Sequence, residues 1–326
     1  MTISLVTGAA GFVGGHLVKA LQQRGENVRA LDLAPVAGID AVQGSVADPE
    51  AARRACEGVD CVFHLAGEAQ LWSKEKGRFE RINIGGAKTM LAAARAAGVK
   101  KFVQCSSLTT LVGKKTPMGP SIADESIVLS PGEMLGAYPR SKASADIAVL
   151  AAAADGFDAS IAIPTEPLGA GDKSLTPPSR LIVDLLNGRT PATIDCMLNF
   201  VSVKSLADGF IAARDKGERG GRYLLGGENV PMRRLLETMA RITGKKMPVA
   251  KLPYAVALAA GIVDTMLIAR FTGKPPTAPL AGVRLAGRRV SFSSDKAMNE
   301  LDWRSEPFEI ALQRAIAWFT EQSLVE

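Results

Sequence analysis

A glycine-rich segment near the N-terminus constrains the fold of this chain more than any other feature. It reads Gly8-Ala9-Ala10-Gly11-Phe12-Val13-Gly14 and lies between an expected strand at 3–6 and an expected amphipathic helix at 12–24. Glycines in such a turn let the backbone reverse tightly, approach a pyrophosphate and pack the helix on the strand, while helix N-terminal amides face the phosphates. The position of these glycines therefore predicts a dinucleotide-binding βαβ unit.

The remainder of the first half alternates between strand and helix patterns. Apolar strands are expected at 28–31, 41–43, 61–65, 102–105 and 160–163, and long helices at 81–97 and 138–154. This alternation predicts an α/β fold with a doubly wound parallel sheet, a Rossmann domain. After Pro164, proline and glycine become frequent and helical patterns dominate. We therefore expect a dinucleotide-binding domain over 1–163, with returns to the sheet near 199–225, and a smaller, mainly helical substrate-binding lobe interleaved over 164–326.

A carboxylate, Asp32, closes the second expected strand. At that place it would accept hydrogen bonds from both ribose hydroxyls of an adenosine and would repel a 2′-phosphate. The next residues, Leu33, Ala34 and Pro35, supply no arginine for such a phosphate. The pattern favours NAD over NADP as the cofactor, and the alternative is that Asp32 is a plain turn residue.

A Tyr-x-x-x-Lys motif, Tyr138 to Lys142, opens the helix expected at 138–154. Residues four apart share a helix face, so the phenol and the ammonium would point into the same cleft. The lysine and a positively charged nicotinamide both favour the phenolate, so we expect the pKa of Tyr138 to be lowered. Ser106 and Ser107 follow a central strand, at the sheet edge where ligands of such folds bind, although either could be a turn hydrogen bonder instead.

Several segments together resemble the extended short-chain dehydrogenases/reductases, the NAD-dependent epimerase/dehydratase family. They are TGAAGFVG at 7–14, HLAG at 64–67, INIGGAKTML at 82–91, CSS at 105–107 and YPRSK at 138–142. The resemblance covers essentially the whole chain. It is strongest to the dihydroflavonol-reductase-like and hopanoid-associated sugar epimerase branch, through the segments at 71–76, 176–199 and 290–303.

The resemblance implies a catalytic triad of Ser107, Tyr138 and Lys142. In this triad Tyr138 would exchange a proton with the substrate oxygen, Lys142 would bind the nicotinamide ribose, and Ser107 would hydrogen-bond the same substrate oxygen. It also implies these cofactor-binding residues: Gly8, Ala10, Gly11, Phe12, Val13, Gly14, Asp32, Ser45, Val46, Leu65, Ala66, Gly67, Asn83, Tyr138, Lys142 and Pro164. Ser45 stands where the family usually has an aspartate near the adenine, and Thr165-Glu166 stands where sugar-nucleotide relatives often have an asparagine.

Charge and cysteine content exclude several other classes of protein. The net charge is +6, but the basic residues are scattered and aromatic residues make up 5%, so no nucleic-acid-binding face is expected. The four cysteines form no Cys-x-x-Cys pair and the two histidines add no metal spacing, which predicts buried, reduced thiols and no metal site. No basic segment precedes the first strand, so we expect no secretory signal and a cytoplasmic protein.

Two other features have alternative interpretations. Residues 252–271 are largely apolar, but Pro253, Gly261, Asp264 and Arg270 interrupt them, so a packed or lid helix is favoured over a membrane span, with a peripheral membrane contact left open. His64 lies in an expected buried strand, which favours a core histidine over a general base.

The leading hypothesis is hydride transfer between NAD(H) and the secondary alcohol or ketone of a fairly hydrophobic small molecule. We expect the substrate to bind under the C-terminal lobe. The apolar content of this lobe favours a hydrophobic molecule and includes Met247, Leu252, Val256, Leu258, Ile262 and Met266. One alternative is an epimerase or dehydratase that retains its NAD, for which Arg288 and Arg289 are candidates to hold a diphosphate. Another is a non-catalytic dinucleotide-binding regulator. The alanine-rich helices at 81–97 and 138–154 also indicate a homodimer.

Overall fold

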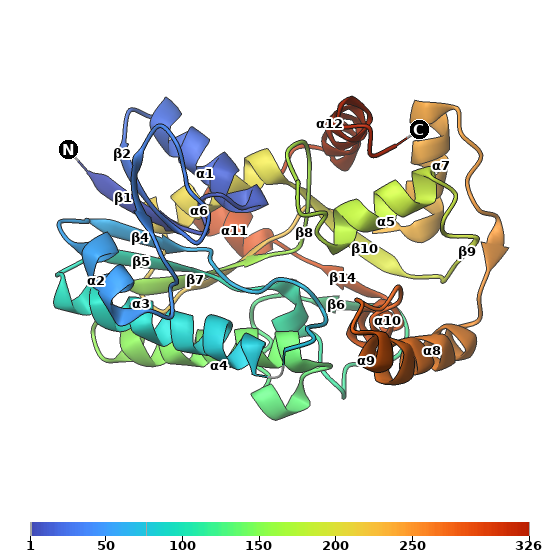
Figure 1. The fold of residues 1–326 in the computed structure, drawn as a ribbon, viewed down its shortest axis with the longest axis horizontal. Helices are drawn as coiled ribbons and strands as arrows, with labels where there is room; N and C mark the ends of the chain where they lie inside the picture. The colour runs from blue at the N-terminus through green and yellow to red at the C-terminus, as the bar shows by residue number, and fades with distance from the viewer. Residues whose placement is uncertain (1, 76, 326) are drawn as a thin grey trace.

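A parallel sheet forms the centre of the molecule. The computed structural model describes residues 2–75 and 77–325, so Lys76, the last residue of the segment 71–76, lies outside it together with Met1 and Glu326. Within the described ranges seven strands pair in parallel in the order β11-β7-β5-β4-β1-β2-β3 (Figure 1). Their bounds are β1 Ile3–Thr7, β2 Asn27–Asp32, β3 Asp40–Gln43, β4 Cys61–His64, β5 Lys101–Cys105, β7 Ala159–Pro164 and β11 Arg222–Leu225.

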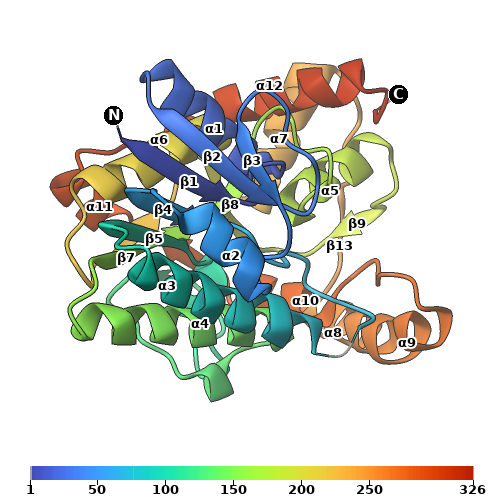
Figure 2. The same cartoon turned by 60° about the vertical axis from the view of Figure 1, so that its left-hand side comes forward.

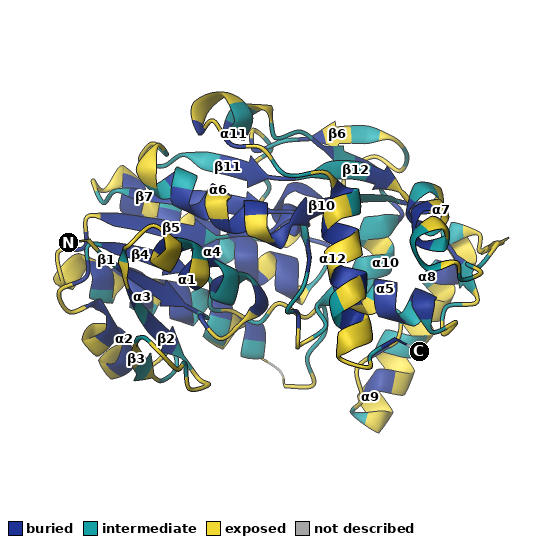
Figure 3. Ribbon diagram, turned by 90° about the horizontal axis from the view of Figure 1, so that it is seen from above, coloured by how far each residue is buried: buried dark blue, intermediate teal, exposed yellow. Residues whose placement is uncertain are grey.

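Helices cover both faces of this sheet, as the alternating pattern predicts. One face carries α1 (Phe12–Gln23), α6 (Val203–Asp215) and α11 (Asp295–Glu300), and the other carries α2 (Pro49–Cys56), α3 (Gly86–Ala96) and α4 (Ala137–Ala154) (Figure 1). Because both faces are covered, the central strands β4 and β7 are buried along their whole length, as Figure 3 shows, whereas the edge strand β3 is largely exposed. The doubly wound α/β fold is confirmed.

The order of the strands reverses between β1 and β4. From β1 the chain moves toward one edge of the sheet through β2 and β3. It then returns to β4, which pairs with the other side of β1 and is the first strand of the opposite half of the sheet. In open α/β sheets ligands bind at the carboxyl ends of the strands beside such a reversal. The glycine loop after β1 and the segment after β4 therefore meet at one site.

A second, smaller sheet organises the C-terminal lobe. It has the order β12-β10-β8, with bounds β8 Glu166–Leu168, β10 Met197–Ser202 and β12 Glu228–Pro231. The helices α5 (Pro177–Leu186), α7 (Met232–Thr243) and α12 (Phe308–Glu321) pack on it, and Phe200 stacks on Phe308 with their ring centroids 6.0 Å apart. Of the returns to the central sheet expected within 199–225, residues 199–202 instead belong to β10 of this smaller sheet, whereas 222–225 form β11 at the edge of the central sheet.

Shorter elements complete the described fold. Residues 80–97 do not form a plain α-helix as expected, because a π-helical turn, η1 (Glu80–Gly85), precedes α3. The others are η2 Leu108–Leu111, β6 Ser121–Ala123, η3 Pro131–Glu133, β9 Ala192–Thr193, β13 Ala250–Lys251, α8 Tyr254–Val263, η4 Asp264–Ile268, α9 Ala269–Thr272, α10 Leu280–Ala286 and β14 Val290–Phe292. In Figure 2, α8 and α9 extend along one side of the molecule, away from the central sheet.

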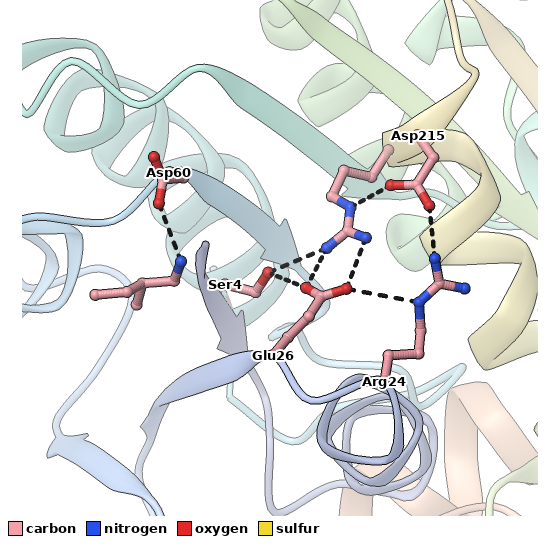
Figure 4. A network of polar contacts seen from close by, with 7 residues as sticks. Ser4, Arg24, Glu26, Asp60 and Asp215 are labelled. Atoms are coloured by element: carbon pink, nitrogen blue, oxygen red, sulfur yellow. Dashed lines mark hydrogen bonds and ion pairs between the residues drawn. The ribbon is translucent and has the colours of Figure 1, made fainter. Parts of the chain in front are cut away.

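A buried ion pair joins α6 to the segment before β2. Arg214 donates to Glu26 from both terminal nitrogens, at 2.5 and 2.9 Å, and their side chains are only 12% and 15% exposed. Ser4 and Arg24 also contact Glu26, and Arg24 reaches Asp215 (Figure 4). Arg214 and Ser4 hold the pKa of Glu26 below its usual value against the effect of burial. This network fixes the amino ends of β1 and β2, at the opposite end of the sheet from the glycine loop.

Candidate active site

A cavity of about 710 Å³ lies at the carboxyl ends of the strands and extends under the C-terminal lobe. The sequence-predicted residues that line it are Gly8, Ala10, Gly11, Phe12, Val13, Gly14, Asp32, Ser45, Val46, Leu65, Ala66, Gly67, Ser107, Tyr138, Lys142 and Pro164. Asn83 is the one predicted site residue absent from this lining. The fold thus brings together segments that are up to 156 positions apart in the sequence, from Gly8 to Pro164.

The glycine loop is held by contacts that leave no room for side chains. Gly8 has φ +72°, and a Cβ there would lie 2.9 Å from the amide nitrogen of Ala66. A Cβ on Gly14 would lie only 2.0 Å from the carbonyl oxygen of Gly8. Gly14 therefore lets α1 pack directly on the turn, and the N-terminus of this 12-residue helix borders the cavity. Such a backbone cradle fits a pyrophosphate.

Asp32 lies at the end of β2, on the cavity wall beside this loop. Its carboxylate accepts hydrogen bonds from the amides of Ala10 and Ala34, both at 3.0 Å. It therefore fixes the glycine loop and keeps a negative charge at the place where an adenosine ribose would lie. Together with the cradle, this arrangement fits a dinucleotide without a 2′-phosphate.

Ser107, Tyr138 and Lys142 share one wall of the cavity. Ser107 follows β5, while Tyr138 and Lys142 lie one turn apart at the start of α4. The Lys142 ammonium donates a hydrogen bond to the carbonyl oxygen of Cys105 at 2.5 Å. The Ser107 hydroxyl lies close enough to the Tyr138 phenol to lower the pKa of that phenol. The Ser107 oxygen also accepts the Thr109 hydroxyl at 3.0 Å. The strand end and the helix start thus hold three proton-bearing groups together.

The pKa of Tyr138 differs from the prediction. Burial raises the pKa of the phenol, and this effect outweighs the charge of Lys142 and the nearby Ser107 hydroxyl, which both lower it. Lys142 acts in the predicted direction, but the depth of burial, which local spacing does not reveal, decides the sign of the shift, so the phenol is protonated at neutral pH.

Asn83 lies one layer behind the cavity wall. Its side-chain oxygen accepts the amide of Glu68 at 2.8 Å, and its side-chain nitrogen donates to the Ser141 hydroxyl at 2.8 Å. Ser141 in turn donates to the carbonyl oxygen of Tyr138 at 2.8 Å. The π-helical turn η1 thus directs Asn83 toward the segment after β4 and toward α4, so that Asn83 positions the residues around the site.

Two acidic residues near the triad were missed by sequence reasoning. Asp146 lies one turn after Lys142 on α4 and accepts a hydrogen bond from Ser106, and burial raises the pKa of its carboxyl to about 6. Glu166, in β8, lines the cavity and accepts the amide of Asn199 at 3.1 Å, and enclosure of its carboxyl raises its pKa to about 8. Asp146 follows Lys142 by four residues, so the sequence could have placed it on the same face of α4. No local pattern indicates that Glu166 faces the cavity, because this depends on the fold.

His64 is a core histidine, as predicted. It is fully enclosed, hydrogen-bonds Thr7 at 2.9 Å and has its pKa lowered to about 3 by burial. The described cysteines are all free thiols, and no group of potential metal ligands occurs in 2–75 or 77–325.

Arg288 donates to the carbonyl oxygens of Lys114 and Thr116, and Arg289 pairs with Asp195. Neither arginine lines the cavity, so their candidate role in holding a diphosphate is wrong.

The apolar residues of the lobe that indicated a hydrophobic substrate lie outside the cavity lining. They are Met247 and Leu252, which precede α8, Val256, Leu258 and Ile262 in α8, and Met266 in η4. Other residues provide apolar walls in their place: Leu71, Pro177, Pro178, Leu181, Met197, Leu198, Phe200, Leu285 and Phe292. These come from the loop after β4, from α5, from β10 and from the segment containing α10 and β14.

Comparison with known proteins agrees with this geometry. Residues 4–226 match the model of the NAD dependent epimerase/dehydratase family. The chain is 32% identical to a dihydroflavonol 4-reductase-like protein of Synechocystis sp., over 98% of this chain and 95% of that protein. It is 30% identical to sterol demethylase protein B of Methylococcus capsulatus, over 99% of both. The crystal structure of gox2253 superposes with a TM-score of 0.85 at 31% identity, covering 100% of both chains. The chain therefore belongs to the NAD-dependent epimerase/dehydratase family, as an enzyme of the extended short-chain dehydrogenase/reductase type whose cofactor is NAD.

Proposed function

We propose that this protein transfers a hydride between NAD(H) and the secondary alcohol or ketone of a largely apolar small molecule, with Ser107, Tyr138 and Lys142 as its catalytic residues. The observation that carries the proposal is the convergence of these three side chains on one wall of the cavity, beside the predicted cofactor cradle. Gly8–Gly14 and Asp32 would hold the dinucleotide at one end, and the triad would act at the other.

The proton chemistry follows from the positions of the three side chains. NAD, when bound, supplies or accepts the hydride. In ketone reduction the Tyr138 hydroxyl gives its proton to the substrate oxygen as the carbonyl carbon gains the hydride, and solvent then returns a proton to the phenolate. Ser107 donates a hydrogen bond to the same oxygen, and Lys142 stabilises the phenolate by its charge. Alcohol oxidation runs through the same steps in reverse.

The composition of the cavity favours an apolar substrate. Among the described lining residues, the basic side chains are Lys142, which belongs to the triad, and Arg78, which pairs with Glu68 at 2.6 Å. A sugar nucleotide carries a diphosphate that would need cationic partners in the substrate part of the cavity. The apolar walls fit a hydrophobic ketone or alcohol better, and the names of the reductase-like and sterol demethylase relatives agree with that class.

The test is NADH oxidation by the purified protein with a panel of apolar ketones, for wild type, Tyr138→Phe and Ser107→Ala. We expect Tyr138→Phe to lower kcat at least about 100-fold, because the proton donor is lost. Binding of NADH, measured by fluorescence, should change little. Full turnover in Tyr138→Phe would overturn the assignment of the triad.

The nucleotide content of the purified protein distinguishes two kinds of enzyme. One exchanges its NAD(H) in each turnover, and the other keeps a bound NAD and returns the hydride to the substrate. A protein that is purified free of dinucleotide and binds NADH reversibly supports the proposed reaction. Roughly stoichiometric NAD released on denaturation would instead indicate an epimerase or dehydratase, because those reactions return the hydride to the substrate. Failure to bind either form would contradict both hydride-transfer hypotheses, whereas reversible binding without turnover of any substrate would leave the non-catalytic dinucleotide-binding regulator.

A further inference from the structure

An apolar helical surface remains exposed on the C-terminal lobe. Helix α8, the π-helical turn η4 and α9 run continuously over Tyr254–Thr272, and by length and composition this stretch could cross a membrane. Its outward side chains range from 42% exposed for Ile262 to 84% for Phe271. The large apolar residues of this outer face are Val256, Ile262, Val263, Met266, Leu267, Ile268 and Phe271. A soluble monomer seldom exposes so many neighbouring apolar side chains without a partner.

The opposite face of the same stretch is fixed to the protein. Ala257, Gly261 and Ala269 are buried, and a Cβ on Gly261 would approach a Val283 side-chain carbon to 3.2 Å. The Asp264 carboxylate accepts the amide of Ala278 at 2.9 Å. The neighbouring Thr265 hydroxyl accepts the amide of Leu280, also at 2.9 Å. These bonds hold the stretch along the surface of the lobe, and the mid-stretch carboxylate opposes insertion across a bilayer.

The charges around the outer face are almost all positive. Residues 246–284 contain five basic side chains and one acidic side chain, Asp264, whose carboxylate is engaged with Ala278. Lys251 precedes the stretch, Arg270 lies within it and Lys274 follows it. Lys74, from the segment after β4, adds a further positive charge at the C-terminal end of the stretch. Its ammonium lies beside Gly273, where a Cβ would be only 2.8 Å away from it. An apolar helix face bordered by lysine and arginine is complementary to an anionic lipid surface.

We propose that the outer face of Tyr254–Thr272 docks in the plane of an anionic lipid bilayer, with its apolar side chains among the acyl chains and its basic residues at the headgroups. Docking also bears on the cavity. Helix α10 packs against α8, and Gly282, Leu285 and Ala286 of α10 line the cavity. The surface therefore places one cavity wall next to the membrane, and a lipid-dissolved substrate would enter there. This last step rests on the proposed function, whereas docking itself does not.

Vesicle flotation tests the docking. Purified protein is mixed with vesicles of phosphatidylcholine alone, or of phosphatidylcholine with phosphatidylglycerol, at low and at high salt. We expect binding to the anionic vesicles that weakens with salt. The variant Leu267→Ser/Phe271→Ser should bind at least about tenfold less, because both changes remove acyl-chain contacts. The matched control is Ile122→Ser/Val128→Ser, which changes side chains of similar exposure, 74% and 78%, in and just after β6. In Figure 3, β6 and α9 lie at opposite edges of the molecule.

Other outcomes overturn the proposal. Equal binding by the two double variants, or no binding by wild type, excludes docking through this face. Wild-type binding that resists both high salt and alkaline carbonate indicates a spanning helix. A dimer in light scattering that becomes a monomer in Leu267→Ser/Phe271→Ser assigns the face to a second copy. If that variant does not fold, Arg270→Gln/Lys274→Gln replaces it, with the same loss of anionic-vesicle binding expected. NADH binding is measured on the same samples. A protein that binds NADH but not vesicles contradicts docking alone, whereas one that binds vesicles but not NADH contradicts the proposed function alone.

Discussion

Asp146 accepts a hydrogen bond from the hydroxyl of Ser106, the immediate neighbour of Ser107, while it lies one helical turn beyond Lys142. This contact ties the helix that carries Tyr138 and Lys142 to the strand end that carries the serines. It also places a buried carboxyl, with a pKa raised to about 6, close to the groups that exchange protons. Asp146 thereby acts as a positioning residue with an electrostatic effect on the phenol.

Asp146→Asn should shift the pH dependence of alcohol oxidation toward lower pH. The ionised Asp146 carboxylate raises the pKa of Tyr138, so its removal favours the phenolate that oxidation requires. The measurement is the pH profile of kcat/KM for the alcohol substrate. Asp155→Asn, at the far end of the same helix, is the control and should leave the profile unchanged. A profile that keeps its position in Asp146→Asn would contradict this electrostatic effect.

Glu166 should make the folded protein less stable as the pH rises. Its pKa is near 8 in the folded protein and near 4.5 in the unfolded chain, so between these values the folded state holds a proton that the unfolded state has lost. The free energy of unfolding therefore falls as pH rises through this range. Chemical denaturation of wild type and Glu166→Gln at several pH values measures the difference.

The window between pH 6.5 and 8 isolates this effect from His64. The His64 pKa is lowered to about 3 from 6.5, so its contribution to stability is complete above pH 6.5 and decreases as the pH falls below that value. In this window the free energy of unfolding of wild type should fall as the pH rises, whereas that of Glu166→Gln should lack this slope. Parallel curves would show that Glu166 is already ionised at neutral pH.

Gly14→Ala should impair both folding and NAD binding. The new Cβ would lie 2.0 Å from the Gly8 carbonyl oxygen, so α1 must move away from the turn. We expect a loss of about 1–3 kcal/mol in stability and a fall in NAD affinity of about tenfold or more. Gly15→Ala is the matched control, since its Cβ would make an ordinary contact at 3.6 Å and alanine is the better helix former. Equal NAD affinity in the two variants would contradict the close approach.

Glu26→Gln should destabilise the protein by about 1–3 kcal/mol. It removes the carboxylate that pairs with both terminal nitrogens of the largely buried Arg214 guanidinium and leaves Asp215 as the remaining charge partner. Urea denaturation gives the value, and activity per folded molecule should be retained, since the pair lies at the amino ends of the strands. Glu50→Gln, in the exposed pair with Arg53, is the control and should change stability little. A similar cost for both variants would show that burial does not strengthen the Glu26 pair.

The homodimer expected through α3 and α4 stays a prediction. The two helices pack against each other, and Ile147 on α4 is half-exposed. Size exclusion with light scattering of wild type and Ile147→Asp decides it: a dimer that dissociates in the variant supports an interface on α4. A wild-type monomer at micromolar concentration would contradict it.

The cofactor half of the site could be predicted from the sequence because its determinants are local. The spacing of Gly8, Gly11 and Gly14 and the position of Asp32 at a strand end follow from short-range backbone geometry. The i, i+4 spacing of Tyr138 and Lys142 likewise follows from the helix alone. These predictions needed only the alternation of strands and helices, and the strand order then placed them together.

The substrate half could not be predicted in the same way because long-range packing decides which residues face the cavity. Met266 and its apolar neighbours have the composition of a pocket wall, yet they point outward, because Asp264 and Thr265 fix the other side of their helix to the lobe. Glu166 has no local signal, and only the pairing of β8 with β10 directs it to the cavity. The depth at which Tyr138 is buried, which reverses the direction of its pKa shift, likewise depends on distant segments such as the one containing Phe79.

The position of β11 determines when the central sheet can be completed during synthesis. Strand β7, which ends at Pro164, is uniformly buried, and its outer hydrogen bonds are made to β11, which ends at Leu225. A nascent chain that has emerged only through β7 therefore carries an apolar strand with an open edge, the kind of edge that recruits other chains. Until the ribosome has released residues 222–225, this edge is open to pairing with other chains.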